Sequence, residues 1–183
     1  MPYTKKWVLF LIVILAMIGV TLPAYAGGNE ILVTTTADGG EGSLREAILT
    51  ANQQTNTTIR FAIDATRPYV IELESALPEI TAPMIIDGES ECATDFAPSV
   101  MRVVIDGSQL PGGDGLYLTN EASGSTIKGL AIGGFEEGAG IYVDGAQNVT
   151  ISCNHIGVDA TGEEALANDI GVYSQGVSLN LSV

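Results

Sequence analysis

Short segments in which apolar and polar residues alternate recur through the second half of the chain. Gly115-Leu116-Tyr117-Leu118 returns as Gly140-Ile141-Tyr142-Val143, and again, after a longer interval, as Gly171-Val172-Tyr173-Ser174. The segments contain many β-branched residues and are bounded by Gly, Asp, Asn and Ser. This pattern is typical of short strands separated by turns rather than of helices.

A second series of apolar positions is interleaved with the first and defines the length of the repeat. One constant step relates Ile127, Leu130 and Ile132-Gly133 to Ile151, Asn154 and Ile156-Gly157. This step falls within the range of about 20 to 50 residues that indicates a solenoid, a propeller or an array. The leucine and asparagine frame of a leucine-rich repeat is absent, and a propeller blade needs a longer unit. The sequence therefore predicts an all-β chain folded as a right-handed parallel β-helix.

Alternation within each coil predicts which side chains face the core. Successive residues of a strand point to opposite faces, so Ile141 and Val143 are expected inside and Tyr142 outside. The same reasoning places Tyr117 and Tyr173 outside, in a row with one ring per coil about 4.8 Å apart. Such a row could bind sugar rings or a protein partner. In the alternative interpretation, the tyrosines pack on each other or beneath the Asp159 loop.

Turns and an insertion complete the repeat. Asp-Gly pairs at 87–88 and 106–107 close predicted strands, since Asp bonds the local backbone and Gly tolerates positive φ. The segment 158–168 accounts for the longer interval before the third tyrosine segment. Insertions in solenoids map to loops, so this segment is expected to project from one edge of the coils.

The segment before the repeats predicts a cap for the open end of the solenoid. Ile31–Thr34 and Ile59–Ile63 have the composition of strands. Between them, Ser43 and Glu46 are spaced as a capping box, in which each side chain bonds the backbone amide of the other residue. The helix that they begin is expected to end at Asn52. Its apolar face consists of Leu44, Ala47, Ile48 and Ala51.

The cap also carries a resemblance to a known family. Gly42-Ser43-Leu44-Arg45-Glu46-Ala47-Ile48, with Thr34-Thr35 before it and Ala51-Asn52 after it, resembles the N-terminal domain named after a Cys-Ser-Leu-Arg-Glu-Ala signature. Proteins with this domain are secreted by bacteria and archaea and mostly continue as right-handed β-helices of the pectin-lyase-like type. The segment 156–162 is similar to a repeat motif of such β-helices. The resemblance implies structural roles for Arg45, as a cap-to-coil hydrogen bond, and for Glu46, while Gly42 replaces the cysteine of the signature.

The N-terminal segment 1–26 has the layout of a cleaved secretory signal. Lys5 and Lys6 precede the apolar run Trp7–Val20, and Ala24-Tyr25-Ala26 supplies a cleavage site. This apolar run is too short to span a bilayer comfortably, which disfavours a membrane anchor. We therefore expect a signal peptide at 1–26, a cap at 27–63 and β-helix coils at 64–183. The mature chain is expected to be secreted, with no membrane partner, or attached to the cell surface through a region beyond Val183.

Charge and cysteine content narrow the function. Without the signal, the chain has five basic and 22 acidic residues, a net charge near −17. A surface this acidic repels phosphate backbones and disfavours nucleic acid as a partner. It could attract Ca²⁺, but no ligand motif supports a calcium site, so no cofactor or metal is predicted. Cys92 and Cys153 lie in different kinds of segment, which favours two buried or free thiols over one disulfide.

Candidate catalytic residues do not form a pattern. The carboxylates nearest the repeats are Asp144, Asp159, Glu163, Glu164 and Asp169. Their spacing does not stack them on one face, and solvated positions in turns and loops explain them better than a catalytic cluster does. His155 is the single histidine, and neighbouring Cys153 is expected to point to the opposite face. The sequence therefore favours a non-catalytic adhesin or matrix-type module that binds polysaccharide or a surface protein. A polysaccharide lyase or glycosidase is the alternative.

The C-terminal end of the chain alternates as the start of another strand. Val177, Leu179, Leu181 and Val183 share one face of this strand. An uncapped solenoid end exposes a strand edge that can pair with another copy. We therefore expect further coils to follow and expect this chain to self-associate through its C-terminal edge.

Overall fold

The computed structural model describes residues 28–90, 100–176 and 178–182, and the side chains up to residue 176. The secretory signal expected at 1–26 lies outside these residues. With 39% strand and 8% helix, the chain is all-β. Its strands form three sheets, and every strand pairing within them is parallel.

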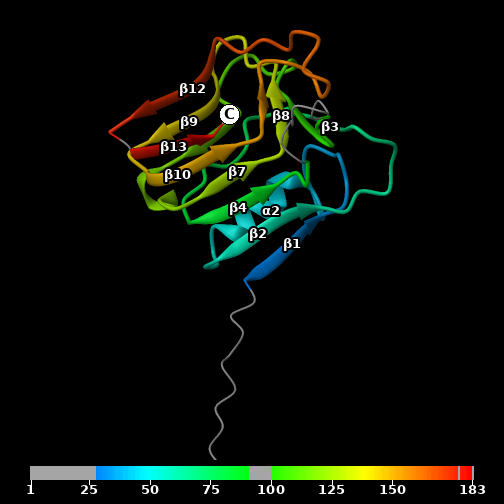
Figure 1. Ribbon diagram of the computed structural model, residues 1–183. Coiled ribbons are helices and arrows are strands. Elements are labelled where there is room, and N and C mark those ends of the chain that lie inside the picture. Colours follow the sequence, from blue (N-terminus) through cyan, green and yellow to red (C-terminus); the bar gives the residue numbers. More distant parts are fainter. Residues whose placement is uncertain (1–27, 91–99, 177, 183) are drawn as a thin grey trace, which may run out of the picture.

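The first sheet is the largest. In Figure 1 its strands lie one above another, from β1 at the bottom to β13. Its strands, in spatial order, are β1 (Asn29–Val33), β2 (Thr57–Phe61), β4 (Met84–Asp87), β7 (Thr126–Lys128), β10 (Gln147–Ser152) and β13 (Ser178–Ser182). The second sheet contains β3 (Tyr69–Glu72), β5 (Val103–Asp106), β8 (Leu130–Gly133) and β11 (His155–Ile156). The third contains β6 (Leu116–Leu118), β9 (Ala139–Asp144) and β12 (Ile170–Gln175).

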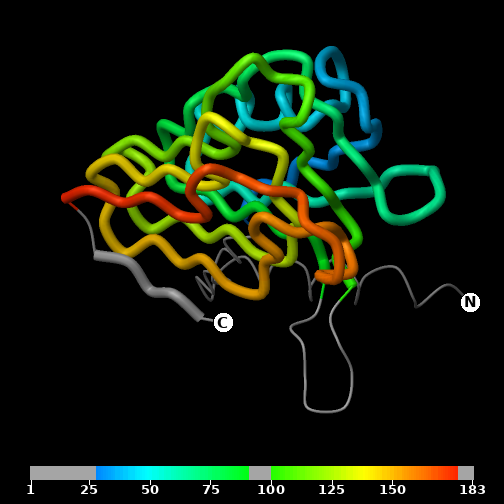
Figure 2. Tube along the Cα trace, turned by 90° about the horizontal axis from the view of Figure 1, so that it is seen from above, coloured from blue at the N-terminus to red at the C-terminus, as the bar shows by residue number. Residues whose placement is uncertain are grey.

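From β4 onward the chain visits the three sheets in turn, and the whole winds into a solenoid of about 5 turns. From β7 it passes to β8 in the second sheet, to β9 in the third, and back to the first sheet at β10. Thr126 then pairs with Thr150, and Ile127 with Ile151, which reproduces the constant step seen in the sequence. Figure 2 shows the later coils lying over the earlier ones. The predicted parallel β-helix is confirmed.

The interior of the coils is a continuous apolar core. The predicted inward residues Ile141 and Val143 are fully buried, as are Leu116 and Leu118 one coil earlier. Each of these side chains stacks on its equivalent because the strands pair without a shift in register. Removal of this surface from water is the main stabilising contribution to such a fold.

The turns confirm the expected role of Asp but not that of Gly. Asp106 Oδ1 accepts hydrogen bonds from the amide and the hydroxyl of Ser108, at 2.9 and 2.6 Å. The following Gly107 does not have a positive φ, which corrects the sequence-based reason for this residue. Glycine is required there because a Cβ atom would collide with the ring of Phe135.

The insertion at 158–168 does not project from the coils as expected but folds back over the outer face of the second sheet. Ala160 is buried in a second apolar cluster with Met101, Val104 and Ala131. The amide of Met101 donates to the carbonyl of Ala160 at 2.8 Å. The loop takes this path because Val104 and Ala131 present apolar surface on the outside of the sheet.

The cap forms the predicted strand, helix and strand, with helix α2 at Leu44–Ala51. Ser43 is its N-cap, and its Oγ accepts from the amide of Glu46 at 3.2 Å. The amide of Ser43 donates to Gly40 O at 3.2 Å instead of to the Glu46 carboxylate, so only half of the expected capping box is present. The predicted apolar face is buried, and the helix ends at Asn52 as expected. It packs against β1 and β2, which begin the first sheet.

Arg45 joins the cap to the coils, as its place in the signature implied. Its guanidinium donates to the carbonyls of Ser75, at 2.7 Å, and of Ala76. It also pairs with Asp38 at 2.6 Å. Burial by itself raises the pKa of Asp38, but hydrogen bonds from Arg45 and from the amide of Glu74 hold the pKa below its ordinary value. The guanidinium therefore crosslinks three segments in a partly buried setting.

Two further features bear on the sequence-based expectations. Gly42 has a φ of 78°, and a Cβ atom there would collide with Thr34 Oγ1, so a cysteine does not fit this backbone. Cys153 is disulfide-bonded, which corrects the expected free thiol, and Cys92 lies outside the described residues. Within the described part of the chain, no helix has the length and apolarity needed to cross a membrane.

We predict that Leu44→Asp destabilises the fold far more than Leu49→Asp in the same helix. Leu44 is fully buried, whereas Leu49 is 43% exposed. Loss of a buried leucine alone costs about 2–5 kcal/mol, and an unpaired carboxylate in its place costs more. Thermal melts monitored by circular dichroism measure both variants. Equal melting temperatures would show that α2 does not cover the core.

Candidate functional site

The outer face of the third sheet carries a strip of three tyrosines, one from each strand. Tyr117 in β6 pairs in register with Tyr142 in β9, which pairs with Tyr173 in β12. The predicted outward row is therefore present. Tyr117 and Tyr142 are half-buried, and Tyr173 is 38% exposed. We call Tyr117, Tyr142 and Tyr173 the tyrosine strip.

The rings of the strip pack on one another, the first two stacked and the third tilted. The ring centroids of Tyr117 and Tyr142 are 4.8 Å apart, with an interplanar angle of 11°. Tyr142 and Tyr173 have the same spacing and a tilt of 42°. The centroid distance equals the spacing of neighbouring strands in a sheet, so the rings follow the pitch of the backbone. The tyrosines therefore pack on each other, as the alternative interpretation expected, while the ring of Tyr173 remains exposed and those of Tyr117 and Tyr142 are partly exposed.

Asp144 links the tyrosine strip across three coils. It follows Tyr142 by two positions on the same outer face of β9. Its Oδ2 accepts from the hydroxyl of Tyr117 at 3.0 Å, and its Oδ1 accepts from Nε2 of Gln175 at 2.7 Å. Both partners are neutral, so neither of them compensates the charge of this carboxylate.

This carboxylate changes the acidity of the phenols. The hydrogen bond from Tyr117 to Asp144, together with desolvation, raises the pKa of Tyr117 to about 12. Desolvation raises the pKa of Tyr142, and the negative charges of an ionised Tyr173, Asp144 and Asp114 raise it further. Tyr117 and Tyr142 therefore stay neutral through the physiological pH range.

The Asp159 loop does not cover the tyrosine strip. The alternative in which the tyrosines pack beneath this loop is therefore wrong. The loop lies instead over the second sheet, where Ala160 is buried. Within the loop, Asp159 accepts hydrogen bonds from the hydroxyl of Thr161, at 2.8 Å, and from the amides of Thr161 and Glu163. These bonds, led by the hydroxyl of Thr161, lower the pKa of the Asp159 carboxyl.

The five carboxylates weighed as catalytic candidates are not brought together. Asp144 belongs to the third sheet, whereas Glu163 and Glu164 are exposed in the Asp159 loop. Asp169 is exposed in the next connection, where its amide donates to Phe135 O at 2.9 Å. Over the described residues, no three His, Cys, Asp or Glu side chains are arranged to hold a metal ion. Asp159 stabilises the turn of its own loop by accepting hydrogen bonds from a hydroxyl and from backbone amides.

His155 and Cys153 serve the structure of the same region. The disulfide occupies the sulfur of Cys153, so it is not available as a nucleophile. His155 Nδ1 lies 3.1 Å from the carbonyl oxygen of Asp159. Its ring also lies close to the backbone at Gly162, where a Cβ atom would approach it to 3.1 Å. The histidine therefore supports the loop from beneath.

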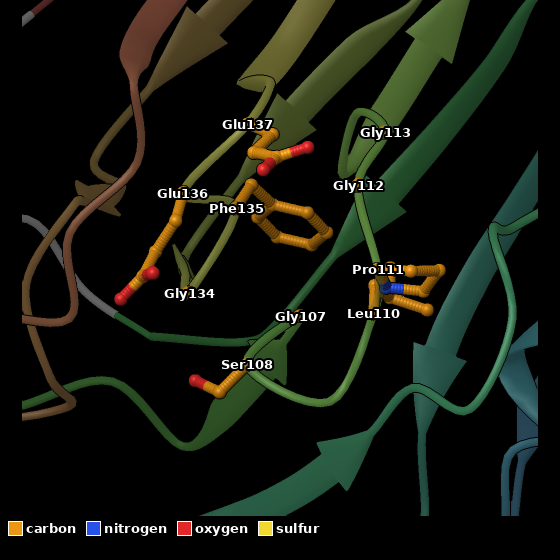
Figure 3. A pocket seen from close by; sticks show the side chains of 10 residues that line it. All are labelled: Gly107, Ser108, Leu110, Pro111, Gly112, Gly113, Gly134, Phe135, Glu136 and Glu137. Atoms are coloured by element: carbon orange, nitrogen blue, oxygen red, sulfur yellow. The ribbon is translucent and has the colours of Figure 1, made fainter.

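A small pocket lies where the second and third sheets meet, at the turn after β5 and the turn after β8. Figure 3 shows the Phe135 ring between the Leu110–Gly113 segment and Glu137, with Glu136 pointing away. The volume of this pocket is about 90 Å³. Typical ligand pockets measure roughly 300–1,000 Å³, so this space suits water rather than a sugar ring.

A larger cleft between the cap and the second sheet was missed by sequence reasoning. It has a volume of about 700 Å³, and its lining includes Asp38, Val70, Glu72, Glu74 and Gln109. Asp38 already forms an ion pair with Arg45. The sequence holds no signal for this cleft because its lining residues come from segments far apart in the chain.

A charged cluster on the first sheet was also missed. The Asp87 carboxylate is largely buried between Lys128, at 3.0 Å, and Arg60, at 3.5 Å. Arg60 also pairs with Glu89 at 3.2 Å, and Arg102 approaches Glu89 at 3.8 Å. The register places Asp87 beside Lys128, a relation that their wide separation in the sequence conceals.

We predict that Tyr117 ionises near pH 12 and that Asp144→Asn lowers this pKa toward the ordinary value of about 10. Since the folded-state pKa is raised, the bond to Asp144 stabilises the fold below pH 10. Its contribution is lost as the pH rises from about 10 through about 12. Tyrosinate absorbance during alkaline titration of the wild type, Asp144→Asn and Tyr117→Phe measures the shift. If Tyr117→Phe removes a phenol that ionises near pH 10, the hydrogen bond to Asp144 is absent in solution.

No family model matches the chain, and no curated protein matches it. Function is therefore inferred from the fold and from the geometry of its outer faces.

Proposed function

We propose that the chain is an exported, non-catalytic β-helix protein of the adhesin or matrix type, in which the coils serve as a rigid spacer and the tyrosine strip binds carbohydrate. The observation that carries this proposal is the in-register stack of Tyr117, Tyr142 and Tyr173 on an outer face. Three neighbouring coils each contribute one exposed or half-exposed ring to this stack.

The shape of the strip favours an extended polymer over a small molecule. Each coil contributes one ring, and the ring centroids repeat at 4.8 Å along the solenoid. A chain lying across the coils would meet an aromatic surface with a phenolic hydroxyl at every step. Aromatic rings with a polar edge suit sugars, which have apolar C–H faces and hydroxyl rims. The strip is not enclosed, so it would hold a segment of a long chain and leave both ends free.

The rest of the fold supports a spacer role. Continuous parallel ladders run through all three sheets, and a core of stacked apolar side chains fills the interior. Such solenoids grow by adding coils and present extended surfaces for binding. The expected export signal and the acidic mature chain support a function outside the cell.

We predict that Tyr142→Ala weakens binding to the recognised glycan by about 1 kcal/mol or more, roughly a fivefold loss of affinity. Tyr142 is the middle ring of the strip, so its removal interrupts the aromatic surface. The same change is expected to lower the stability by about 1 kcal/mol, because two ring contacts are lost. A glycan array followed by titration calorimetry, well below the melting temperature, measures the affinity.

The matched control is Ile85→Ala, on the outer face of the first sheet, where the side chain is 38% exposed. It should leave glycan binding unchanged. A lower melting temperature for Tyr142→Ala without any change in glycan signal would assign the strip to packing alone and contradict the proposal.

A further inference from the structure

We infer that the tyrosine strip selects a positively charged glycan, a polymer of amino sugars, over neutral and acidic ones. This inference rests on the proposed carbohydrate-binding function and adds the chemical class of the ligand. It is carried by the distribution of charge around the strip.

The strip is edged by carboxylates. Asp144 lies directly on it, bonded to Tyr117 and Gln175 through one hydrogen bond to each oxygen. A carboxylate has about four lone-pair sites, so Asp144 can accept further donors from a ligand. Asp114, whose Oδ1 accepts from the amide of Ala139 at 2.7 Å, precedes β6 by two positions. The negative charges of Glu79 and Asp114 also reach the phenols.

The basic side chains are engaged elsewhere. All five that follow the expected signal lie among the described residues. Lys128 and two arginines belong to the charged cluster of the first sheet. Arg45 pairs with Asp38 in the cap, and Arg67 lies over the ring of Tyr69 at 5.8 Å from its centroid. None of the described cations forms an ion pair with Asp144, so the charge of the strip is uncompensated.

This distribution of charge discriminates among glycans. A polyuronate would place its carboxylates beside Asp144 and be repelled, and the net charge near −17 adds to that repulsion. A neutral glycan gains contact with the rings alone. An ammonium group gains, in addition, a charge-assisted hydrogen bond to Asp144.

The spacing of the rings disfavours a basic peptide in an extended conformation. Side chains on one face of an extended peptide recur every ~6.7 Å, because each residue rises about 3.3–3.4 Å. The rings recur every 4.8 Å, so a peptide would fall out of step across the strip.

The test compares three hexasaccharides by titration calorimetry at a pH where amines are protonated: a glucosamine hexamer, its N-acetylated form and a galacturonate hexamer. The wild type should bind the glucosamine hexamer roughly three- to fivefold more tightly than the acetylated one, as expected for one exposed ion pair, and should not bind the galacturonate. Asp144→Asn should remove this preference, so that the variant binds the glucosamine hexamer no more tightly than the acetylated one. Glu72→Gln, an exposed change on the second sheet, is the matched control and should alter nothing.

The outcomes separate this inference from the proposed function. Equal affinity for the charged and acetylated hexamers, lowered by Tyr142→Ala but not by Asp144→Asn, would overturn the charge selectivity and leave the binding strip in place. No binding of either hexamer would contradict both. Equal losses in Asp144→Asn and Glu72→Gln would reveal general attraction to an acidic protein and overturn the role of Asp144. A hexalysine peptide that binds as tightly as the glucosamine hexamer would overturn the assignment to a glycan.

Discussion

Parallel pairing in register, which is interrupted at the start of β10 by an irregularity between Gln147 and Val149, is the constraint on which the inner and outer faces of these coils depend. Each coil hydrogen-bonds to the next at one strand spacing, so a residue and its equivalent in the following coil lie directly above one another. Apolar residues that face inward then form columns and bury each other, as Leu116 and Ile141 do. A single-residue slip would expose such a column, which explains why the alternating pattern specifies the register so strongly.

The same constraint builds the outer faces. It stacks Tyr117, Tyr142 and Tyr173 from three separate segments of the chain, and it sets Asp87 beside Lys128. Neither arrangement requires a pocket. The protein therefore offers ligands a patterned surface whose pitch is fixed by the backbone. This is the physical reason that an extended, repeating partner fits it better than a compact one.

Where the coils bend, side chains provide the hydrogen-bond partners that neighbouring backbone groups provide within the strands. Asn154 accepts from the amide of Leu130 at 3.0 Å and donates to the carbonyl of Ile127 at 2.9 Å, between β7 and β8. Asn168 does the same for Phe135 and Ile132. A corner interrupts the ladder and would leave buried polar groups unpaired, which costs free energy. The amide side chains satisfy these groups and hold consecutive coils together.

Local periodicity and a constant repeat were enough to predict the fold class, the inward and outward positions, the helical cap and the row of tyrosines. They could not predict the path of the 158–168 loop, the disulfide at Cys153 or the half-formed capping box at Ser43. Those depend on which outer surface is apolar and which atoms meet in space. Nor could they place Asp144 between Tyr117 and Gln175, since that contact joins three coils. Periodicity fixes what each residue faces, but only the stacked coils decide which residues become neighbours.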